Sequence, residues 1–152
     1  MAIGDYEVIT RASRALRAAP EPGWAAVEQR VLQAVRATPR AGWPFDAVDP
    51  DHLFISEITL AELKCAVELS DATEKNYRAL DLFLSGVKVL PVFHALDLYA
   101  KEKARLLKAG ASVDDYDLLI GATAVTHNLV LVTDGKQNTP RIKGLKLEDW
   151  TQ

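Results

Sequence analysis

Three acidic residues lie far apart in the chain, yet each stands beside a stretch with the pattern of a strand or a helix start. Glu62 follows the apolar run LFISEIT, Asp117 lies in DYDLLIGATA, and Asp134 directly follows LVLVT. Ligand-binding residues of parallel sheets gather beyond the carboxyl ends of the strands. Carboxylates brought together there would suit Mg²⁺ or Mn²⁺, which take oxygen ligands and activate water for attack on a phosphodiester.

Each acid also has an ordinary structural explanation. Thr59 and Glu62 have the spacing of a capping box, in which the glutamate bonds back to the helix start. Asp114 and Asp115 fit as helix caps or solvated first-turn acids, where they favour the helix dipole. Asp134 precedes a glycine, which is a common turn pair. No phosphate-binding loop, dinucleotide fingerprint, HExxH or GxSxG motif offers a competing chemistry.

The elements that must position these acids alternate between strand and helix after residue 52. Strand patterns cover Leu53–Ile58, Val87–Val92, Leu129–Thr133 and Leu145–Leu147. Helical patterns cover Leu60–Leu69, Ala72–Leu84, Ala95–Leu107 (ending at Gly110) and Asp115–Thr126. Strands joined by helices of this length need right-handed crossovers, so the sequence predicts an α/β fold. Its sheet should be largely parallel and flanked by helices on both faces.

The first fifty residues have a different composition from the rest. They contain six Arg and no Lys, whereas residues 51–152 contain nine Lys and three Arg. Two helices are expected in this part, over Tyr6–Ala19 and Trp24–Ala37, followed by a Pro-rich connector. The predicted organisation is therefore an Arg/Ala-rich helical segment over 1–50 and an α/β domain over 51–152.

Composition narrows the class of protein further. Apolar residues make up 49% of the 152 residues, enough for a folded core, and the net charge of −3 provides no global attraction for nucleic acid. One cysteine, Cys65, excludes an internal disulfide framework and suits a reducing cytosol. No apolar run approaches the roughly 20 residues of a membrane span. The expectation is a cytoplasmic protein that does not engage a membrane.

An ordered set of motifs carries a family likeness from Leu53 to Trp150. These are FISEITLAELKCAVE, NYRALDLFLSGVKVLPV, ALDLYAKEKARLLKAG, DYDLLIGATAVTHNLVLVTD and RIKGLKLEDW. In order and spacing the chain resembles the PIN-domain ribonucleases, specifically the VapC toxins of type II toxin–antitoxin pairs. The resemblance implies a parallel sheet flanked by helices, cleavage of an RNA substrate with Mg²⁺ or Mn²⁺, and a small antitoxin as partner.

The resemblance also assigns roles to individual residues. Glu62 in ITLAEL matches the catalytic glutamate of the family, and Asp117 matches the acid before its apolar helix. Asp134 in LVTD lies where the family places its last ligand, and Thr133 matches the threonine that orients that turn. Glu62, Asp117 and Asp134 are thus the expected catalytic and metal-binding residues.

Basic residues follow Asp134 and offer contacts for RNA phosphates. Lys136, Arg141 and Lys143 are the candidates, with Lys146 close behind them. The alternative is a solvated C-terminal loop with no role in binding, and the sequence leaves both interpretations open.

The chain departs from the family pattern at its start. Such proteins begin with a short apolar strand ending in Asp-Thr-Asn or Asp-Ser-Asn, which supplies the first metal ligand. The nearest approach here, YEVITR, has Ile9 where the aspartate would be and lies far upstream of the Leu53 strand. We therefore expect an N-terminally incomplete PIN-like domain whose missing strand is replaced by the helical N-terminal segment, a second copy of the chain in a homodimer, or a partner.

These observations support three interpretations of function. The first is a metal-dependent ribonuclease toxin, weak or inactive because one acidic ligand is missing. The second is a non-catalytic PIN-like module that binds an antitoxin or RNA. The third is a fusion or truncated product without an activity of its own, which the change in composition near residue 50 keeps open.

Overall fold

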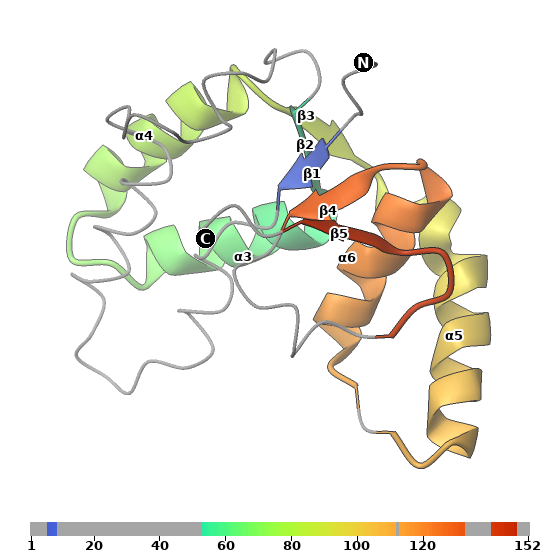
Figure 1. Ribbon diagram of the computed structural model, residues 1–152. Coiled ribbons are helices and arrows are strands. Elements are labelled where there is room, and N and C mark those ends of the chain that lie inside the picture. The colour runs from blue at the N-terminus through green and yellow to red at the C-terminus, as the bar shows by residue number, and fades with distance from the viewer. Residues whose placement is uncertain (1–5, 9–52, 112, 133–140, 149–152) are drawn as a thin grey trace.

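The computed structural model describes residues 6–8, 53–111, 113–132 and 141–148, and in this part of the chain five short strands form one parallel sheet (Figure 1). Their order across the sheet is β3-β2-β1-β4-β5. The strands are β1 (Tyr6–Val8), β2 (Leu53–Ser56), β3 (Lys88–Leu90), β4 (Val130–Val132) and β5 (Lys146–Glu148). The predicted α/β class and parallel sheet are confirmed.

Strand β1 corrects one expectation. The helix predicted to begin at Tyr6 is wrong over Tyr6–Val8, because this segment is the central strand of the sheet. Tyr6 pairs with both Leu53 and Val130, and Val8 pairs with Val132. The position of the family's first strand is therefore filled from within the chain, and Ile9 is the residue that follows it. The rest of the predicted helical segment lies outside the described residues, and the boundary at residue 50 stays a prediction.

The helices match the predicted order closely. They are α3 (Glu57–Glu68), α4 (Thr73–Leu84), α5 (Leu96–Lys108) and α6 (Asp115–Thr126), with a short 3₁₀ helix, η3 (Val92–Ala95), before α5. Helix α3 begins three residues earlier than predicted, immediately after β2. A single-helix membrane crossing needs about 20 apolar residues, and no helix among these described elements meets that requirement.

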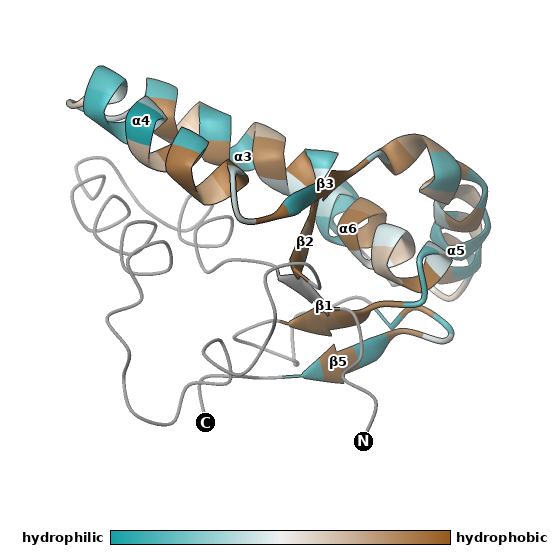
Figure 2. Ribbon diagram, turned by 90° about the horizontal axis from the view of Figure 1, so that it is seen from above, coloured by the Kyte–Doolittle hydropathy of each residue, from teal (hydrophilic) through white to brown (hydrophobic). Residues whose placement is uncertain are grey.

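Neighbouring residues of β2 divide the core between the two faces of the sheet, as the alternation of side chains along a strand requires. Ile55 packs with Leu63 and Val67 of α3 and Leu80 of α4. Phe54 packs instead with the cluster of α6 and β4 that includes Leu131. The hairpin α3–α4 lies to one side of the strands and the pair α5–α6 to the other (Figures 1 and 2). Apolar packing thereby fixes both helices that carry a candidate acid, α3 with Glu62 and α6 with Asp117.

The end of α5 and the C-terminal segment complete the packing around α6. Gly110 has φ +71°, a left-handed conformation that suits glycine, and ends α5 as the sequence predicts. Leu106 of α5, Leu118 of α6 and Ile142 form a third buried cluster. A Cβ atom at Gly121 would lie 2.5 Å from the Ile142 side chain, so the absence of a side chain there allows the C-terminal segment to approach α6 closely.

Candidate metal centre

The start of α3 determines how Glu62 is presented. Ser56, the last residue of β2, is the N-cap, and its Oγ accepts a hydrogen bond of 3.0 Å from the Thr59 N–H. The hydroxyl groups of Ser56 and Thr59 are also bonded to each other at 3.1 Å, and both side chains are fully buried. Thr59 is therefore inside the helix and not its cap.

This geometry removes the capping explanation for Glu62. With Ser56 as the cap, Glu62 lies in the second turn of α3, beyond reach of the cap N–H that a capping-box glutamate would bind. The Thr59–Glu62 capping box, which the sequence offered as the structural alternative to a metal ligand, is therefore not formed. Only 7% of Glu62 is exposed. Burial of a carboxylate is costly unless hydrogen bonds, a cation or a metal ion compensates for it. The environment of Glu62 must therefore contain such compensating interactions.

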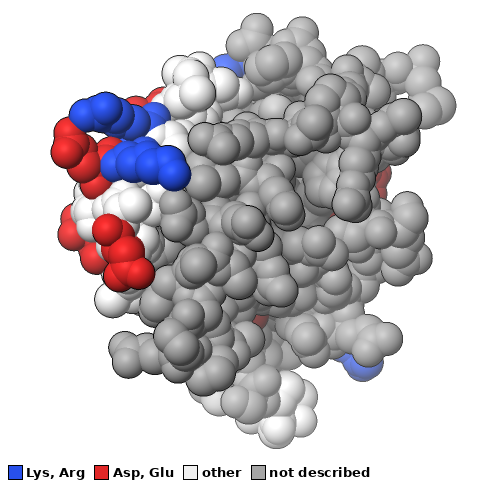
Figure 3. Space-filling model, turned by 90° about the vertical axis from the view of Figure 1, so that its left-hand side faces the viewer, with Lys and Arg blue, Asp and Glu red and all other residues white. Residues whose placement is uncertain are grey.

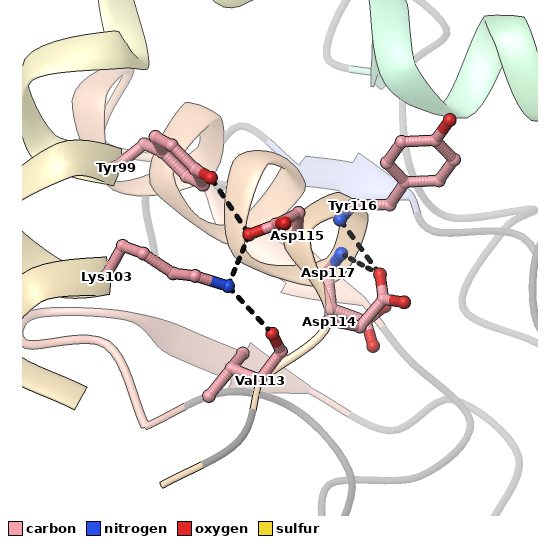
Figure 4. A network of polar contacts seen from close by, with 7 residues as sticks. All are labelled: Tyr99, Lys103, Val113, Asp114, Asp115, Tyr116 and Asp117. Atoms are coloured by element: carbon pink, nitrogen blue, oxygen red, sulfur yellow. Dashed lines mark hydrogen bonds and ion pairs between the residues drawn. The ribbon is translucent and has the colours of Figure 1, made fainter. Parts of the chain in front are cut away.

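The start of α6 presents Asp117. The N-cap is Asp114, whose Oδ1 accepts hydrogen bonds from the N–H groups of Tyr116 (2.8 Å) and Asp117 (3.2 Å) (Figure 4). The predicted capping role of Asp114 is confirmed. Asp117 is the third residue of the helix and is partly exposed, so its carboxylate has access to a ligand near the positive end of the helix dipole.

Asp115, between these two acids, is bound by side chains of α5. Its Oδ1 accepts hydrogen bonds from Lys103 Nζ at 2.5 Å and from the Tyr99 hydroxyl at 2.9 Å (Figure 4). The bond from Lys103, and after it the bond from Tyr99, lowers the pKa of the Asp115 carboxyl. Asp115 is thus the ion-pair partner of Lys103 and lies in the first turn of α6, where the sequence predicted it.

The topology brings Glu62 and Asp117 toward the same edge of the sheet. Helix α3 begins directly at the carboxyl end of β2. Helix α6 precedes the parallel strand β4 and packs against it, so the first turn of α6 lies at the carboxyl end of the sheet. The two helices are in contact. Two carboxylates are hard oxygen donors of the kind that Mg²⁺ and Mn²⁺ prefer, so this donor set fits such an ion.

The third predicted ligand is not placed. Asp134 and its neighbour Thr133 lie outside the described residues, so their roles as ligand and orienting residue stay predictions. Within the described ranges, no group of three or more His, Cys, Asp or Glu residues is arranged to hold a metal ion.

The candidate RNA-binding residues lie at different places relative to β5. Arg141 and Lys143 are exposed and precede β5, whereas Lys146 is its first residue and donates to Asn128 Oδ1 at 3.0 Å, before β4 begins. Lys146 is therefore at the amino end of the sheet, opposite the candidate metal site. Lys136 lies outside the described residues.

Charges on the described surface of the α3–α4 side are mixed in sign. Figure 3 shows acidic and basic side chains next to one another on that face. The Arg78–Glu74 ion pair of α4, with 77% and 84% of the side chains exposed, is one example. This part of the surface gives no uniform positive field for a polyanion.

Sequence reasoning missed a partly buried ion pair that holds the segment of Arg141 and Lys143. Glu102 of α5 is 5% exposed and accepts hydrogen bonds from Arg105 Nε (3.1 Å) and Nη2 (2.5 Å). It also accepts one from the Lys143 N–H at 3.3 Å, while Arg105 donates to the Arg141 carbonyl at 2.6 Å. The bonds from Arg105 lower the pKa of Glu102 against the opposing effect of burial. The sequence signal was the i, i+3 spacing of opposite charges.

Comparison with known proteins decides the family. Residues 32–144, more than half of the chain, match the PIN domain. The chain belongs to the PIN-domain family. Within that family the likeness is to the VapC type of toxin: the tRNA(fMet)-specific endonuclease VapC of Salmonella typhimurium is 33% identical over 104 residues, covering 68% of this chain and 79% of that protein.

Solved structures of VapBC proteins agree with this placement. The VapBC-1 structure from nontypeable Haemophilus influenzae superposes with a TM-score of 0.68 at 26% identity, covering 97% of this chain and 98% of that one. A member of the VapBC family of toxin–antitoxin systems, VapBC-5 from Mycobacterium tuberculosis, superposes with a TM-score of 0.51 at 25% identity, over 64% of this chain and 79% of that one. The predicted PIN-domain, VapC-type assignment is confirmed.

Proposed function

We propose that this protein is a divalent-metal-dependent endoribonuclease toxin of the VapC type, with a metal site weakened by the absence of one acid. The observation that carries the proposal is the position of Glu62. Its carboxylate is buried in the second turn of α3, has no capping role there, and belongs to a helix packed against the helix of Asp117. A divalent cation shared by the two carboxylates would offset both the burial and their mutual repulsion.

In this proposal each residue has a definite task. Glu62 and Asp117, joined by Asp134, hold Mg²⁺ or Mn²⁺, and the ion when bound supplies Lewis-acid activation of the phosphodiester. Thr133 orients the turn that carries Asp134. Arg141 and Lys143, with Lys136, bind RNA phosphates beside the acids; the Glu102–Arg105 pair supports the first two by holding their backbone.

The weakening follows from the residue after β1. In the sequence, Ile9 directly follows the described strand β1, at the position where the family resemblance puts its first acid. Affinity for a divalent ion depends on the number of charged ligands, so a smaller set binds more weakly. This same observation favours the second candidate function, a PIN-like module that binds an antitoxin or RNA without cleaving it.

We also propose the partners that the family assignment suggests. An antitoxin encoded with this chain would control it, as the VapBC family of toxin–antitoxin systems, to which one solved relative belongs, suggests. A second copy of the chain, forming a homodimer, and a cytoplasmic location complete the proposal.

Mn²⁺-titrated cleavage of RNA tests the proposed activity. We expect the wild-type chain to cleave only at high Mn²⁺ and Asp117→Asn to be inactive at every concentration. Ile9→Asp should lower the Mn²⁺ concentration for half-maximal cleavage by about tenfold or more, because it restores the acid that the family places after its first strand. Equal cleavage by wild type and Asp117→Asn would reject the metal site, and no cleavage by wild type or Ile9→Asp would favour the non-catalytic module.

A further inference from the structure

Three acids crowd the first turn of α6 and the residue before it, and the structure treats each of them differently. Asp114 is used as the cap, Asp115 is bound by Lys103 and Tyr99, and Asp117 is the candidate ligand. Like charges so close together repel one another, so the arrangement favours a fixed cation nearby. Lys103 provides such a cation through its contact with Asp115.

Lys103 contacts the chain on both sides of the cap. Its Nζ binds the Asp115 carboxylate at 2.5 Å and the carbonyl oxygen of Val113 at 3.1 Å (Figure 4). Val113 directly precedes the cap and Asp115 directly follows it. The cap carboxylate of Asp114 in turn bonds the N–H of Asp117. One ammonium group therefore fixes a continuous path of backbone and side-chain contacts that ends at Asp117.

The side chain is well placed to be held rigidly. Lys103 has 24% of its side chain exposed, against 55% for Asp115, and it arises from α5, which packs along α6. Tyr99, one turn earlier on α5, donates to the same Asp115 oxygen. Two donors from one helix thus converge on one carboxylate oxygen of the next, which fixes the rotation of the α6 start relative to α5.

We propose that Lys103 is a positioning residue for the metal site: by bridging Val113 and Asp115 around the Asp114 cap, it sets the first turn of α6 so that Asp117 meets a divalent cation in the required geometry. The inference rests on the proposed function, because it assumes that Asp117 binds a metal. Residues that orient metal ligands without touching the ion typically change metal affinity by about 10–100-fold when mutated.

The sign of the effect separates positioning from simple electrostatics. Removal of a positive charge near a carboxylate site should strengthen the binding of Mn²⁺, because the site becomes more negative. Loss of positioning should weaken the binding of Mn²⁺, because the ligand is no longer held in place. A decrease in affinity upon removal of the Lys103 charge therefore has no electrostatic explanation.

The experiment measures Mn²⁺ affinity by calorimetry on the full chain without RNA. We expect Lys103→Met to weaken binding by about tenfold, and Lys103→Arg to recover part of the loss because it keeps a donor and a charge. The matched control is Lys101→Met, which removes an exposed lysine of the same helix and should leave affinity unchanged or slightly higher. Thermal unfolding without metal should show that both variants fold cooperatively, with a modest decrease in stability for Lys103→Met because it loses its ion pair with Asp115.

Several outcomes would overturn the inference. If Lys103→Met binds Mn²⁺ as tightly as the wild type or more tightly, Lys103 does not position Asp117. If that variant does not fold, Tyr99→Phe, which removes a single hydrogen bond, takes its place; it should weaken binding by a smaller factor, and unchanged binding would reject the inference. If the wild-type chain itself binds no Mn²⁺, the proposed function fails and this inference fails with it.

Discussion

Helices α3 and α6 each present one candidate metal ligand, but their first turns are built in opposite ways. The start of α3 is buried: Ser56 and Thr59 are fully enclosed and bond to each other, and Glu62 follows in the second turn. The start of α6 is exposed: Asp114 and Asp115 lie at the surface, where Asp114 accepts bonds from backbone N–H groups and Asp115 is held by side chains of α5.

The difference indicates which helix start contributes more to the stability of the fold. A polar group at a buried helix start has no water to replace a lost partner, whereas water can substitute at an exposed start. We therefore expect mutations at the start of α3 to destabilise the whole domain. Mutations at the start of α6 should mainly change how Asp117 is presented and leave the folded state largely intact.

The largest expected effect is at the α3 cap. Ser56→Ala removes the cap of the Thr59 N–H and leaves the buried Thr59 hydroxyl without its Ser56 partner. The free energy of unfolding should fall by about 2 kcal/mol, the combined effect of a lost cap and a lost buried hydrogen bond. Urea denaturation of the metal-free chain measures this value. A loss below about 0.5 kcal/mol would show that the buried hydroxyl pair does not stabilise α3.

A second, smaller effect is expected at Glu102, a buried carboxylate of α5. Asp115, an exposed carboxylate that α5 binds through Lys103, serves as the comparison. In Glu102→Gln, Arg105 and the Lys143 N–H lose a charged acceptor. The free energy of unfolding at neutral pH should therefore fall by about 1.5 kcal/mol, as expected for a charged hydrogen-bond acceptor. Asp115→Asn should have a smaller effect, since its ion pair is exposed and screened. Urea denaturation of the two variants compares these losses.

The pH dependence of this second prediction follows from the lowered pKa of Glu102. A group whose pKa is lower in the folded state adds stability above its unfolded value, and that stability is lost as the pH falls through the folded value. The difference in stability between wild type and Glu102→Gln should therefore be constant near neutral pH, shrink below the ordinary glutamate pKa of about 4.5, and vanish in stronger acid. A difference that persists unchanged at low pH would mean that packing, not charge, is responsible.

A third effect, smaller than that of Glu102→Gln, is expected at the α6 cap. Asp114→Ala removes the acceptor of two N–H groups at an exposed helix start. This change should cost about 1 kcal/mol, roughly half the loss for Ser56→Ala. Urea denaturation of both variants under one set of conditions gives the ratio. Equal losses at the two caps would contradict the distinction between the buried and the exposed start.

The two helix starts also show what the sequence could predict. The cap at Asp114 was identified correctly because the loop before α6 separates it from other elements. The start of α3 was misplaced because β2 passes into α3 without a loop, so Ser56 serves both as the last strand residue and as the cap. The serine three positions before Thr59 carried the signal, but Thr59 and Glu62 offered the same spacing and a more familiar motif.

The first strand was missed for a tertiary reason. Tyr6–Val8 spans only three residues, and the alanines and arginines that follow from Arg11 onward favour a helix, which outweighed the strand-favouring residues of YEVIT. Its conformation is set by pairing with β2 and β4, partners that lie more than forty and more than one hundred residues away. The apolar strands and amphipathic helices after residue 52 were predictable because each carries its own periodicity.

The central claim is that α3 and α6 deliver Glu62 and Asp117 to one metal ion. The most direct test is a double-mutant cycle of Mn²⁺ affinity with Glu62→Gln, Asp117→Asn and the double variant. Two ligands of one ion are coupled, so each single variant should lose most of the binding and the double variant should lose little more. Fully additive losses, or a single variant that binds Mn²⁺ like the wild type, would contradict a shared site.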